Sequence, residues 1–584
     1  MNNQIGNDIN LGNIVGPNGQ SLKLSKESRD KHLYVCGSTG TGKSKFLENL
    51  IRQDVLNWRN SKCGLIVIDP HGSLFDNLIE WLAWHQPYLE RPIIPIDLRR
   101  KDWVIGYNVV RPREESDPSV VVSNFVQAMA YVWGQGGTNE TPLFERWASN
   151  LLRMLYEHKL TLLEAEFLTD HLTKDIRRAM TDKLASSTMK QDWEYANSLT
   201  PKDFEAQISS TVNRLHRFLS TQLIRQMLGQ SGASLDLGQA MAEGHIILVS
   251  LATKGGRVSD EDASLFATLL LSDLWGAAKE RGKPAGGRSH KPFYVYVDEF
   301  QNFVTPTIAK NLDQARGFGL HLTLAHQFPN QLLHVGAHGK QVYDSVFENA
   351  RTKAVFSLES EENLRPLAQT LFRHVMSPDK IKLELYSTKV MGYVEEYRTA
   401  YSRSRSEGSG HGSQSGHSAG KGVGGTVTHS DLGGDSHSES SSKFQAQSGS
   451  DSQTSSEGKA EGESESPMLI PQMGKELSSV QYENLEEQLF RAMAVLHDQE
   501  QRQCVVRPVG AKVPVSLFTP TVENVPQTSE RTERYTAKLL NKLPFALKTV
   551  EAQKQLADRA QQMAERYLGG GGSDEPSTAR RPTP

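Results

Sequence analysis

The chain has 584 residues, a length that predicts two to four domains at about 150 residues per domain. Its 65 Lys and Arg against 68 Asp and Glu give a formal net charge of -3, which excludes a protein that coats nucleic acid through bulk charge. The three cysteines, Cys36, Cys63 and Cys504, lie far apart, which argues against a disulfide framework or a zinc site.

The sequence shows neither a membrane span nor a signal peptide. Its most apolar windows, residues 245–252 and 265–278, are shorter than the roughly 18 to 20 apolar residues that a spanning helix needs. The N-terminus lacks the basic region and apolar block that are typical of a signal peptide. We therefore expect a cytoplasmic protein without an intrinsic membrane span, which a partner could recruit to the inner face of the membrane.

Residues 1–30 are expected to form an N-terminal β-hairpin extension, with Pro17-Asn18-Gly19 as its turn. After them, short apolar runs rich in β-branched residues recur, separated by segments with helical periodicity. Near-continuous apolar strands are typical of a parallel sheet covered on both faces, so the expected fold class is α/β with a mainly parallel sheet. These strands begin at Leu33, Leu65, Ile93, Ile246, Phe293, Leu322 and Lys353.

Residues 115–232 are expected to form an all-α domain inserted between the third and the fourth of these strands. The segment has almost no strand character, and Trp147, Leu151 and Leu155 repeat at helical spacing. The insertion divides the α/β domain, whose first part is residues 31–114 and whose second part is residues 233–401.

Residues 402–466 interrupt the α/β domain again, with a segment that we expect to be disordered. They contain 20 Ser and 13 Gly, and such a composition buries too little apolar area to offset the loss of chain entropy. The histidines at 411, 417, 429 and 437 could be read as metal ligands, but their irregular spacing favours a solvated linker.

Ordered patterns resume after this insertion. Residues 467–526 are expected to be the third part of the α/β domain, with two short strands across a Gly turn from Gln503. A C-terminal helical segment at 527–568 follows and stops at a run of glycines. Residues 569–584 are expected to be a disordered tail.

Residues 37–44 match the P-loop pattern GxxxxGK[ST], directly after one expected strand and directly before a helix-forming segment. This context argues against a chance glycine-rich turn. Backbone N–H groups of a P-loop point at phosphates, its Lys reaches the β- and γ-phosphates and its Ser hydroxyl binds Mg²⁺. The pattern predicts ATP and Mg²⁺ as cofactors, with Mg²⁺ on Ser44 and the nucleotide held by Gly37, Ser38, Thr39, Gly40, Thr41, Gly42, Lys43 and Ser44.

Asp298 and Glu299 follow an apolar strand, at the edge where open α/β sheets bind ligands. We expect Asp298 to hold Mg²⁺ through water, and Glu299, pointing the other way in the pleat, to polarise the attacking water. Two acids at a strand end also occur on ordinary surfaces, and the P-loop upstream is what favours the catalytic interpretation.

Two further residues flank the next strand. Gln327, at its end, could contact the γ-phosphate or the attacking water, or could simply cap the strand. Arg316, in the turn before it, is a candidate arginine finger for a neighbouring subunit, or a solvated arginine at a helix end. Asp69-Pro70-His71-Gly72, after the second strand, either lines the nucleotide pocket or forms a turn.

In combination, these motifs resemble the HerA/FtsK branch of P-loop ATPases, and within it the TraD/TraG-like coupling ATPases of conjugative DNA transfer and type IV secretion. The resemblance rests on HLYVCGSTGTGKS, IDPHGSL, VDEFQNFV and QARGFGLHLTLAHQ, in this order, and covers most of residues 10–400 and 483–525. It implies a RecA-like motor with an inserted all-α domain, which moves DNA through the centre of a ring-shaped hexamer by using ATP. It also places Arg316 in the family's trans-acting arginine position and Gln327 in its γ-phosphate-sensing position.

Two features depart from the family's pattern. Membrane-anchored coupling proteins carry N-terminal spanning helices, whereas this chain begins with the expected hairpin. Ser73 stands where an acidic residue is usual.

The leading hypothesis is a Mg²⁺-dependent ATP hydrolase that translocates DNA as a homo-hexamer and serves as a coupling protein, with a relaxase and type IV secretion channel components as partners. A second is a HerA-like DNA translocase or helicase in repair or phage defence, with a nuclease partner. A third is a nucleotide-gated adaptor for protein cargo. Stimulation of ATP turnover by DNA would separate a motor from an adaptor.

Overall fold

The structure is a computed structural model that describes residues 8–16, 19–87, 92–111, 118–133, 141–255, 257–281, 290–303, 312–334, 339–405, 424–425, 439–440, 459–526 and 528–568. The chain divides into two compact units: unit 1 is Met1–Pro378 with Asn484–Pro584, and unit 2 is Asp379–Glu483. Among the helices within the described ranges, none combines the length and the apolar character that crossing a membrane requires.

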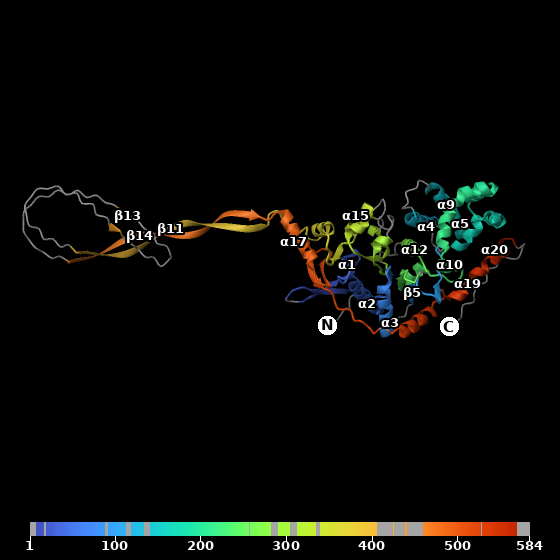
Figure 1. Ribbon diagram of the computed structural model, residues 1–584, viewed down its shortest axis with the longest axis horizontal. Coiled ribbons are helices and arrows are strands. Elements are labelled where there is room, and N and C mark those ends of the chain that lie inside the picture. The colour runs from blue at the N-terminus through green and yellow to red at the C-terminus, as the bar shows by residue number, and fades with distance from the viewer. Residues whose placement is uncertain are drawn as a thin grey trace, which may run out of the picture. The chain divides into compact units, whose positions relative to one another are not determined.

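A mainly parallel sheet forms the centre of unit 1 (Figure 1). Its parallel strands lie in the order β10-β3-β9-β8-β4-β7-β5. Each apolar run that the sequence predicts as a strand is found here, so the α/β fold class is confirmed. The bounds are β3 Leu33–Cys36, β4 Gly64–Asp69, β5 Ile93–Asp97, β7 Ile246–Ser250, β8 Phe293–Val297, β9 Leu320–His326 and β10 Thr352–Val355.

Antiparallel strands extend this sheet beyond β10. β15 (Gln503–Arg507) pairs with β10, and β16 (Val515–Phe518) pairs with β15. β1 (Ile9–Ile14) then pairs with β16, and β2 (Ser21–Leu24) with β1. The N-terminal hairpin is therefore the edge of the main sheet rather than a separate extension, and its expected turn residues 17–18 lie outside the described residues.

Helices cover both faces of the sheet, because neighbouring residues of a strand point to opposite sides. α2 (Lys43–Ser61) and α3 (Ser73–His85) cover one face, where Val35 and Val67 are buried in the same cluster as residues of both helices. This packing holds the N-terminus of α2 at the end of β3.

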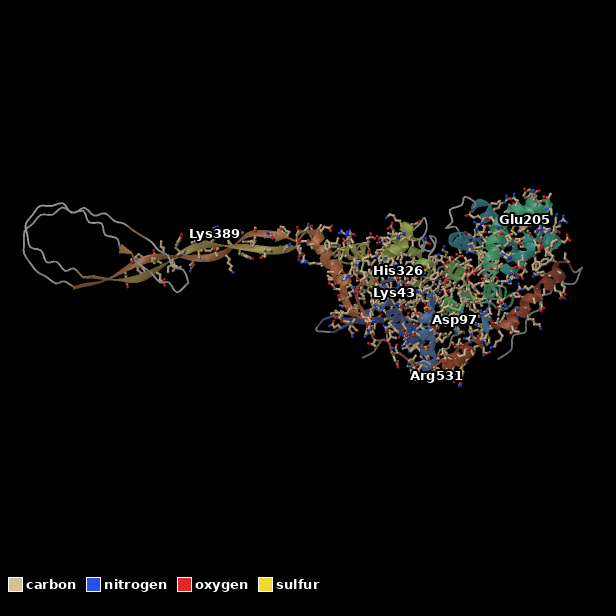
Figure 2. The ribbon with its side chains drawn as sticks, viewed as in Figure 1. Lys43, Asp97, Glu205, His326, Lys389 and Arg531 are labelled. Atoms are coloured by element: carbon tan, nitrogen blue, oxygen red, sulfur yellow. The ribbon has the colours of Figure 1, made fainter. Side chains whose placement is uncertain are left out.

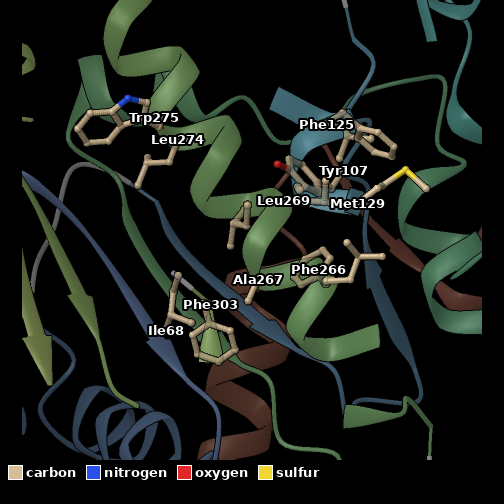
Figure 3. Packing of buried hydrophobic residues seen from close by; sticks show 14 of the residues in the cluster. Ile68, Tyr107, Phe125, Met129, Phe266, Ala267, Leu269, Leu274, Trp275 and Phe303 are labelled. Carbon is tan, nitrogen blue, oxygen red and sulfur yellow. The ribbon is translucent and has the colours of Figure 1, made fainter. Parts of the chain in front are cut away.

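The other face is covered by α12 (Asp260–Glu280), which separates the sheet from the all-α domain. Figure 3 shows Phe266 and Leu269 of α12 between Ile68 of β4 and the α4 residues Phe125 and Met129. One hydrophobic cluster thus runs from the sheet into the helical domain. Shorter helices outside the all-α domain include α1 Lys26–Arg29, α11 Leu237–Glu243, α14 Leu312–Ala315, α15 Gly339–Asn349, α16 Glu361–Leu371 and α17 Leu485–His497.

The described part of residues 115–232 is helical. Trp147 of α5 is 1% exposed and packs edge-on against Trp193 of α8. α9 begins where the Thr200 side chain accepts a hydrogen bond from the backbone N–H of Asp203, with Pro201 in the first turn. The helices are α4 Pro118–Trp133, α5 Thr141–Glu157, α6 Ala165–Thr169, α7 Lys174–Asp182, α8 Ser187–Ser198, α9 Pro201–Leu219 and α10 Gln222–Leu228.

After β16 the chain runs along the α/β domain to the all-α domain. α18 (Ser529–Leu540) packs against α3 and β5, and β17 (Ala546–Lys548) pairs with β6 (Trp103–Ile105). α19 (Thr549–Ala557) and α20 (Arg559–Leu568) reach α10 and α7. There the buried Arg559 donates to Thr161 and forms an ion pair with Glu164, so the C-terminal segment ties the two domains together.

Unit 2 contains a long antiparallel ribbon, in which β11 (Ile381–Arg405) pairs with β14 (Lys459–Tyr482) (Figure 1). The boundaries expected at 401–402 and 466–467 are wrong, since both fall inside these strands. A ribbon needs only continuous backbone pairing, which Ser-rich sequence can supply, so composition does not mark its end. A further short pair joins Gly424–Gly425 to Glu439–Ser440. The four histidines of the expected insertion lie outside the described residues.

Candidate nucleotide site

The order of the sheet brings three of the predicted motifs to one place. β3 lies beside β9, and β9 beside β8, all parallel. The P-loop follows β3, Gln327 follows β9, and Asp298 and Glu299 follow β8. Because parallel strands end at the same edge, the motifs meet at the carboxyl edge of the sheet, where α/β folds bind ligands.

Glycines allow the P-loop to turn tightly between β3 and α2. Gly42 caps α2 with φ 111°, in the left-handed region that favours glycine. A Cβ atom on Gly37 would lie 2.5 Å from the Cβ atom of Phe356. The loop therefore needs Gly42 for its backbone conformation and Gly37 for the close approach of the segment after β10.

Lys43, which is labelled in Figure 2, is the first residue of α2, and its ammonium group contacts the acidic pair. Its Nζ atom lies 2.9 Å from Oε1 of Glu299 and 3.6 Å from Oδ1 of Asp298. All three side chains are buried. The structure therefore brings together the P-loop lysine and both acids, and the phosphates of a nucleotide would compete with these carboxylates for the lysine.

Glu299 does not follow the pleat of β8. The strand ends at Val297, and Glu299 has φ 45° and ψ 47°, the left-handed conformation. The expectation that Asp298 and Glu299 point in opposite directions is therefore wrong, because the chain leaves the strand before them and both carboxylates reach Lys43.

Two amides hold the carboxylate of Glu299. Nε2 of Gln327 donates to Oε1 at 3.3 Å, and Nε2 of Gln301 donates to Oε2 at 2.9 Å. The backbone carbonyl of Gln327 also accepts from the N–H of Gly37 at 3.2 Å. Gln327 thus contacts both the P-loop and the expected catalytic base.

The two acids differ in their electrostatic surroundings. Burial raises the pKa of Asp298 to about 6, although Lys43 opposes the shift. Burial also acts to raise the pKa of Glu299, but Lys43 and the hydrogen bonds from Gln301 and Gln327 outweigh it, so that pKa lies below its usual range. Glu299 therefore stays ionised at neutral pH.

The donor set at this edge suits Mg²⁺. Ser44 offers a hydroxyl in the first turn of α2, and Asp298 offers a buried carboxylate with a raised pKa. Oxygen donors of this kind, completed by phosphates and water, are what Mg²⁺ prefers. The described residues contain no cluster of three His, Cys, Asp or Glu that could hold a metal ion by itself.

The segment after β4 forms a turn. Asp69 is 1% exposed, and its carboxylate accepts from the N–H groups of His71 and Phe75, each at 2.9 Å. These bonds hold the start of α3. The negative charge of Asp69 also helps to raise the pKa of Asp298, although less than burial and Glu299 do, while Lys43 lowers it. Of the two interpretations of Asp69-Pro70-His71-Gly72, the geometry favours the turn.

Arg316 lies at the opposite edge of the sheet. It is exposed and begins the 3-10 turn Arg316–Phe318, before β9, whereas Gln327 follows β9. The 7 residues of β9 separate the two ends by about 20 Å. Burial raises the pKa of Asp30, which precedes β3, and Arg316 is the foremost charge opposing that shift. The structure therefore does not bring Arg316 to the P-loop of its own chain.

Sequence reasoning missed two glutamines that support the site. Gln301 holds Glu299, and Oε1 of Gln331 accepts from the N–H groups of Gln327 and Phe328 at 3.2 and 3.1 Å. Neither glutamine belongs to a recognisable sequence motif. Only their closeness to site residues could have pointed to them, since Gln301 is two residues after Glu299 and Gln331 is four residues after Gln327.

A P-loop that faces an acidic pair and an amide from neighbouring parallel strands defines a P-loop NTPase with a RecA-like sheet. Two family models match the chain. The central domain of the helicase HerA matches residues 9–86, and the TraM recognition site of TraD and TraG matches residues 292–373. The resemblance to the HerA/FtsK branch, and within it to TraD/TraG-like ATPases, is therefore confirmed. A search of curated proteins finds no match.

Solved structures of similar fold include the bacterial conjugative coupling protein TrwBdeltaN70 in its unbound monoclinic form, with 13% identity and a TM-score of 0.44 over 88% of this chain and 90% of that one. The plasmid coupling protein TrwB in complex with ADP and Mg²⁺ has 14% identity and a TM-score of 0.43, over 88% and 90%. VirB4 of Thermoanaerobacter pseudethanolicus has 14% identity and a TM-score of 0.41, over 65% and 90%. Because these TM-scores lie below 0.5, the resemblance to the family rests on the matches to the two family models.

Proposed function

We propose that this protein is a Mg²⁺-dependent ATPase that translocates DNA as a ring-shaped hexamer and serves as a coupling protein for conjugative DNA transfer or type IV secretion. The observation that carries the proposal is the cluster of Lys43, Glu299 and Gln327 beside the P-loop, at the carboxyl edge of the sheet. The match of residues 292–373 to the TraM recognition site of TraD and TraG supports the role in DNA transfer.

In this proposal each residue of the cluster has a separate task. The N–H groups of the P-loop and the ammonium group of Lys43 bind and orient the phosphates. Glu299, which is ionised at neutral pH, accepts a proton from the attacking water, and Gln327 orients that water beside the γ-phosphate. Mg²⁺, held by Ser44 and Asp298, would neutralise phosphate charge.

Hydrolysis also needs positive charge on the γ-phosphoryl group as it leaves. In our proposal Arg316 of a neighbouring subunit supplies this charge. The support is its exposed position at the edge opposite its own P-loop, which is too far away for it to act on the nucleotide of its own chain. DNA, the other copies of the chain, a relaxase and channel components are the partners that this function requires.

ATP turnover measured with no DNA, with single-stranded DNA and with double-stranded DNA, together with the mass of the oligomer, tests the proposal. We expect DNA to stimulate turnover several-fold, a hexameric mass in the presence of nucleotide, and no turnover by Lys43→Ala. Turnover that ignores DNA would favour the adaptor for protein cargo, and a parent protein without turnover would overturn the ATPase itself.

A second candidate is a HerA-like translocase in repair or phage defence with a nuclease partner. The match of residues 9–86 to the central domain of the helicase HerA favours it. Purifying the protein together with the products of its neighbouring genes distinguishes the two functions. Co-purification of a nuclease would support the second, and of a relaxase the first.

A further inference from the structure

A turn from the far end of the chain lies against the P-loop. It follows α17 and precedes β15, and it contains Gln501 and Arg502. The backbone N–H of Arg502 donates to the carbonyl oxygen of Thr41 at 2.8 Å, and Nε2 of Gln501 donates to the carbonyl oxygen of Gly40 at 3.2 Å. Two consecutive P-loop carbonyls are therefore bound by one turn.

The direction of these carbonyls matters for nucleotide binding. In a trans peptide the C=O of one residue and the N–H of the next point in opposite directions. Holding the carbonyl of Thr41 against the turn consequently directs the N–H of Gly42 to the other side, which in a P-loop is the side of the phosphates. The N–H of Thr41, on the other side of the peptide group from the carbonyl of Gly40, donates to the carbonyl of Ser38 at 3.4 Å, so the bond from Gln501 holds a peptide group that also closes the turn of the loop.

The turn is itself held in place. Arg502 has φ 70°, a left-handed conformation that is unusual for a residue other than glycine. Its carbonyl accepts from the N–H and the hydroxyl of Thr519 at 2.9 and 3.1 Å, and its Nη2 atom donates to the carbonyl of Thr519 at 2.7 Å. A Cβ atom on Gly42 would lie 3.2 Å from the Cα atom of Arg502, so the turn and the P-loop fit closely.

We propose that Gln501 and Arg502 are positioning residues of the nucleotide site, which orient the peptide groups of the P-loop for phosphate binding. This inference rests on the proposed function. Gln501 acts through its side chain, whereas Arg502 acts through its backbone N–H and its left-handed conformation. Both residues act on the shape of the P-loop rather than on Glu299 and Gln327, which activate the water in our proposal. Removing their hydrogen bonds to the P-loop therefore weakens nucleotide binding and leaves the rate of the chemical step unchanged.

The full-length protein allows two matched comparisons. Gln501→Met removes the amide donor to the P-loop, and Gln499→Met removes a similar bond in the same turn, from Nε2 of Gln499 to the carbonyl of Leu496 at 2.8 Å. Arg502→Val places a β-branched residue at a left-handed position, whereas Arg502→Gly loses the same guanidinium group but favours that backbone. The readouts are the Kd for ADP with Mg²⁺ by calorimetry, and KM and kcat for ATP.

We expect Gln501→Met to raise the Kd for ADP and the KM for ATP about fivefold, the effect of one lost hydrogen bond, with kcat within about twofold of the parent. Gln499→Met should bind as the parent does, Arg502→Gly should bind more tightly than Arg502→Val, and Arg502→Val should bind at least as weakly as Gln501→Met. Equal binding by the members of either pair, or a fall in kcat without a rise in KM, would overturn the inference. A parent protein that does not bind ADP would overturn the proposed function as well.

Discussion

Lys43 forms a buried ion pair with the carboxylate that we assign as the catalytic base. Such a pair holds the ammonium group away from water. The phosphates of a nucleotide must displace the carboxylate before they can contact the ammonium group. In our proposal the carboxylate of Glu299 therefore has opposite effects on binding and on chemistry. It opposes nucleotide binding because it competes with the phosphates for Lys43, and it promotes hydrolysis because it accepts a proton from water.

We therefore expect Glu299→Gln to lower kcat at least about 100-fold, because the amide cannot accept a proton from water. The same change should tighten ADP binding, since Lys43 loses its competing partner. Lys43→Ala should abolish both binding and turnover. Steady-state kinetics and calorimetry with ADP measure the two effects, and an unchanged kcat in Glu299→Gln would remove this residue from the catalytic role.

His326, next to Gln327, makes stability depend on pH. It is fully buried, with its Nε2 atom 2.7 Å from the hydroxyl of Tyr34, and burial lowers its pKa to about 3. The unfolded chain has a histidine pKa of about 6.5. Between these values the unfolded state binds a proton that the folded state does not, so stability falls as the pH falls.

From pH 7.5 to pH 5.5 this one residue should lower the free energy of unfolding by about 1.4 kcal/mol. His326→Gln should remove that share of the pH dependence, whatever its effect on stability at pH 7.5. His171→Gln, at an exposed histidine, is the control. Urea unfolding at the two pH values gives the comparison, and an identical pH dependence in the parent and His326→Gln would refute it.

At the scale of elements, β9 lies between two residues that we propose to serve different nucleotide sites. Its carboxyl end presents Gln327 to the P-loop of the same chain, and Arg316 precedes its amino end. A strand is rigid along its length because both neighbours, β3 and β8, pair with it. In the hexamer that we propose, this strand would keep Gln327 and Arg316 at a fixed separation.

The ribbon of β11 and β14 contains none of the residues that we assign to the nucleotide site. Every residue that we assign to that site lies in unit 1, whereas β11 and β14 belong to unit 2. Arg405 and Lys459 are direct partners in its register, so a two-residue turn can join them.

Replacing residues 406–458 by Asn-Gly should therefore leave basal ATP turnover within about twofold of the parent, because a two-residue Asn-Gly turn matches the twist of a hairpin. Turnover without DNA, measured at equal protein concentration, is the readout. A loss of tenfold or more would mean that the replaced residues contribute to the nucleotide site, and the assignment of that site to unit 1 would be incomplete.

At the scale of the whole molecule, Arg316, the arginine finger that we propose, lies away from the P-loop of its own chain. The P-loop lies at the carboxyl edge of the sheet and Arg316 at the amino edge. The ring of copies that we propose would resolve this, because in a heterologous interface one surface of each chain meets the other surface of the next. In this arrangement each chain binds ATP and completes its neighbour's site.

Mixing two inactive proteins tests the arrangement. Lys43→Ala and Arg316→Ala should each be inactive alone, but a mixture at equal amounts should regain about a quarter of the parental turnover, since about a quarter of random interfaces pair an intact P-loop with an intact arginine. Arg365→Ala, at an exposed arginine paired with Glu361 and Glu486, should be active alone. A mixture that stays inactive would contradict the trans role of Arg316.

The sequence by itself determined the strands of the parallel sheet, the P-loop and the acidic pair. Apolar runs such as the one at Phe293 commit a segment to a buried strand, and the glycines around Lys43 commit the backbone to a phosphate loop. These are local properties, because a few adjacent residues decide them, and the structure shows them where the sequence predicts them.

Only the tertiary structure decided which of these segments meet. Strand order brings Gln327 to Glu299, and the chain's return through β15 brings Arg502 to the P-loop. The turn of Glu299 toward Lys43, and the ribbon that runs into Ser-rich sequence, were likewise outside the reach of local patterns. The physical reason is that packing and backbone pairing join surfaces far apart in the chain, and no short run of residues records its distant partner.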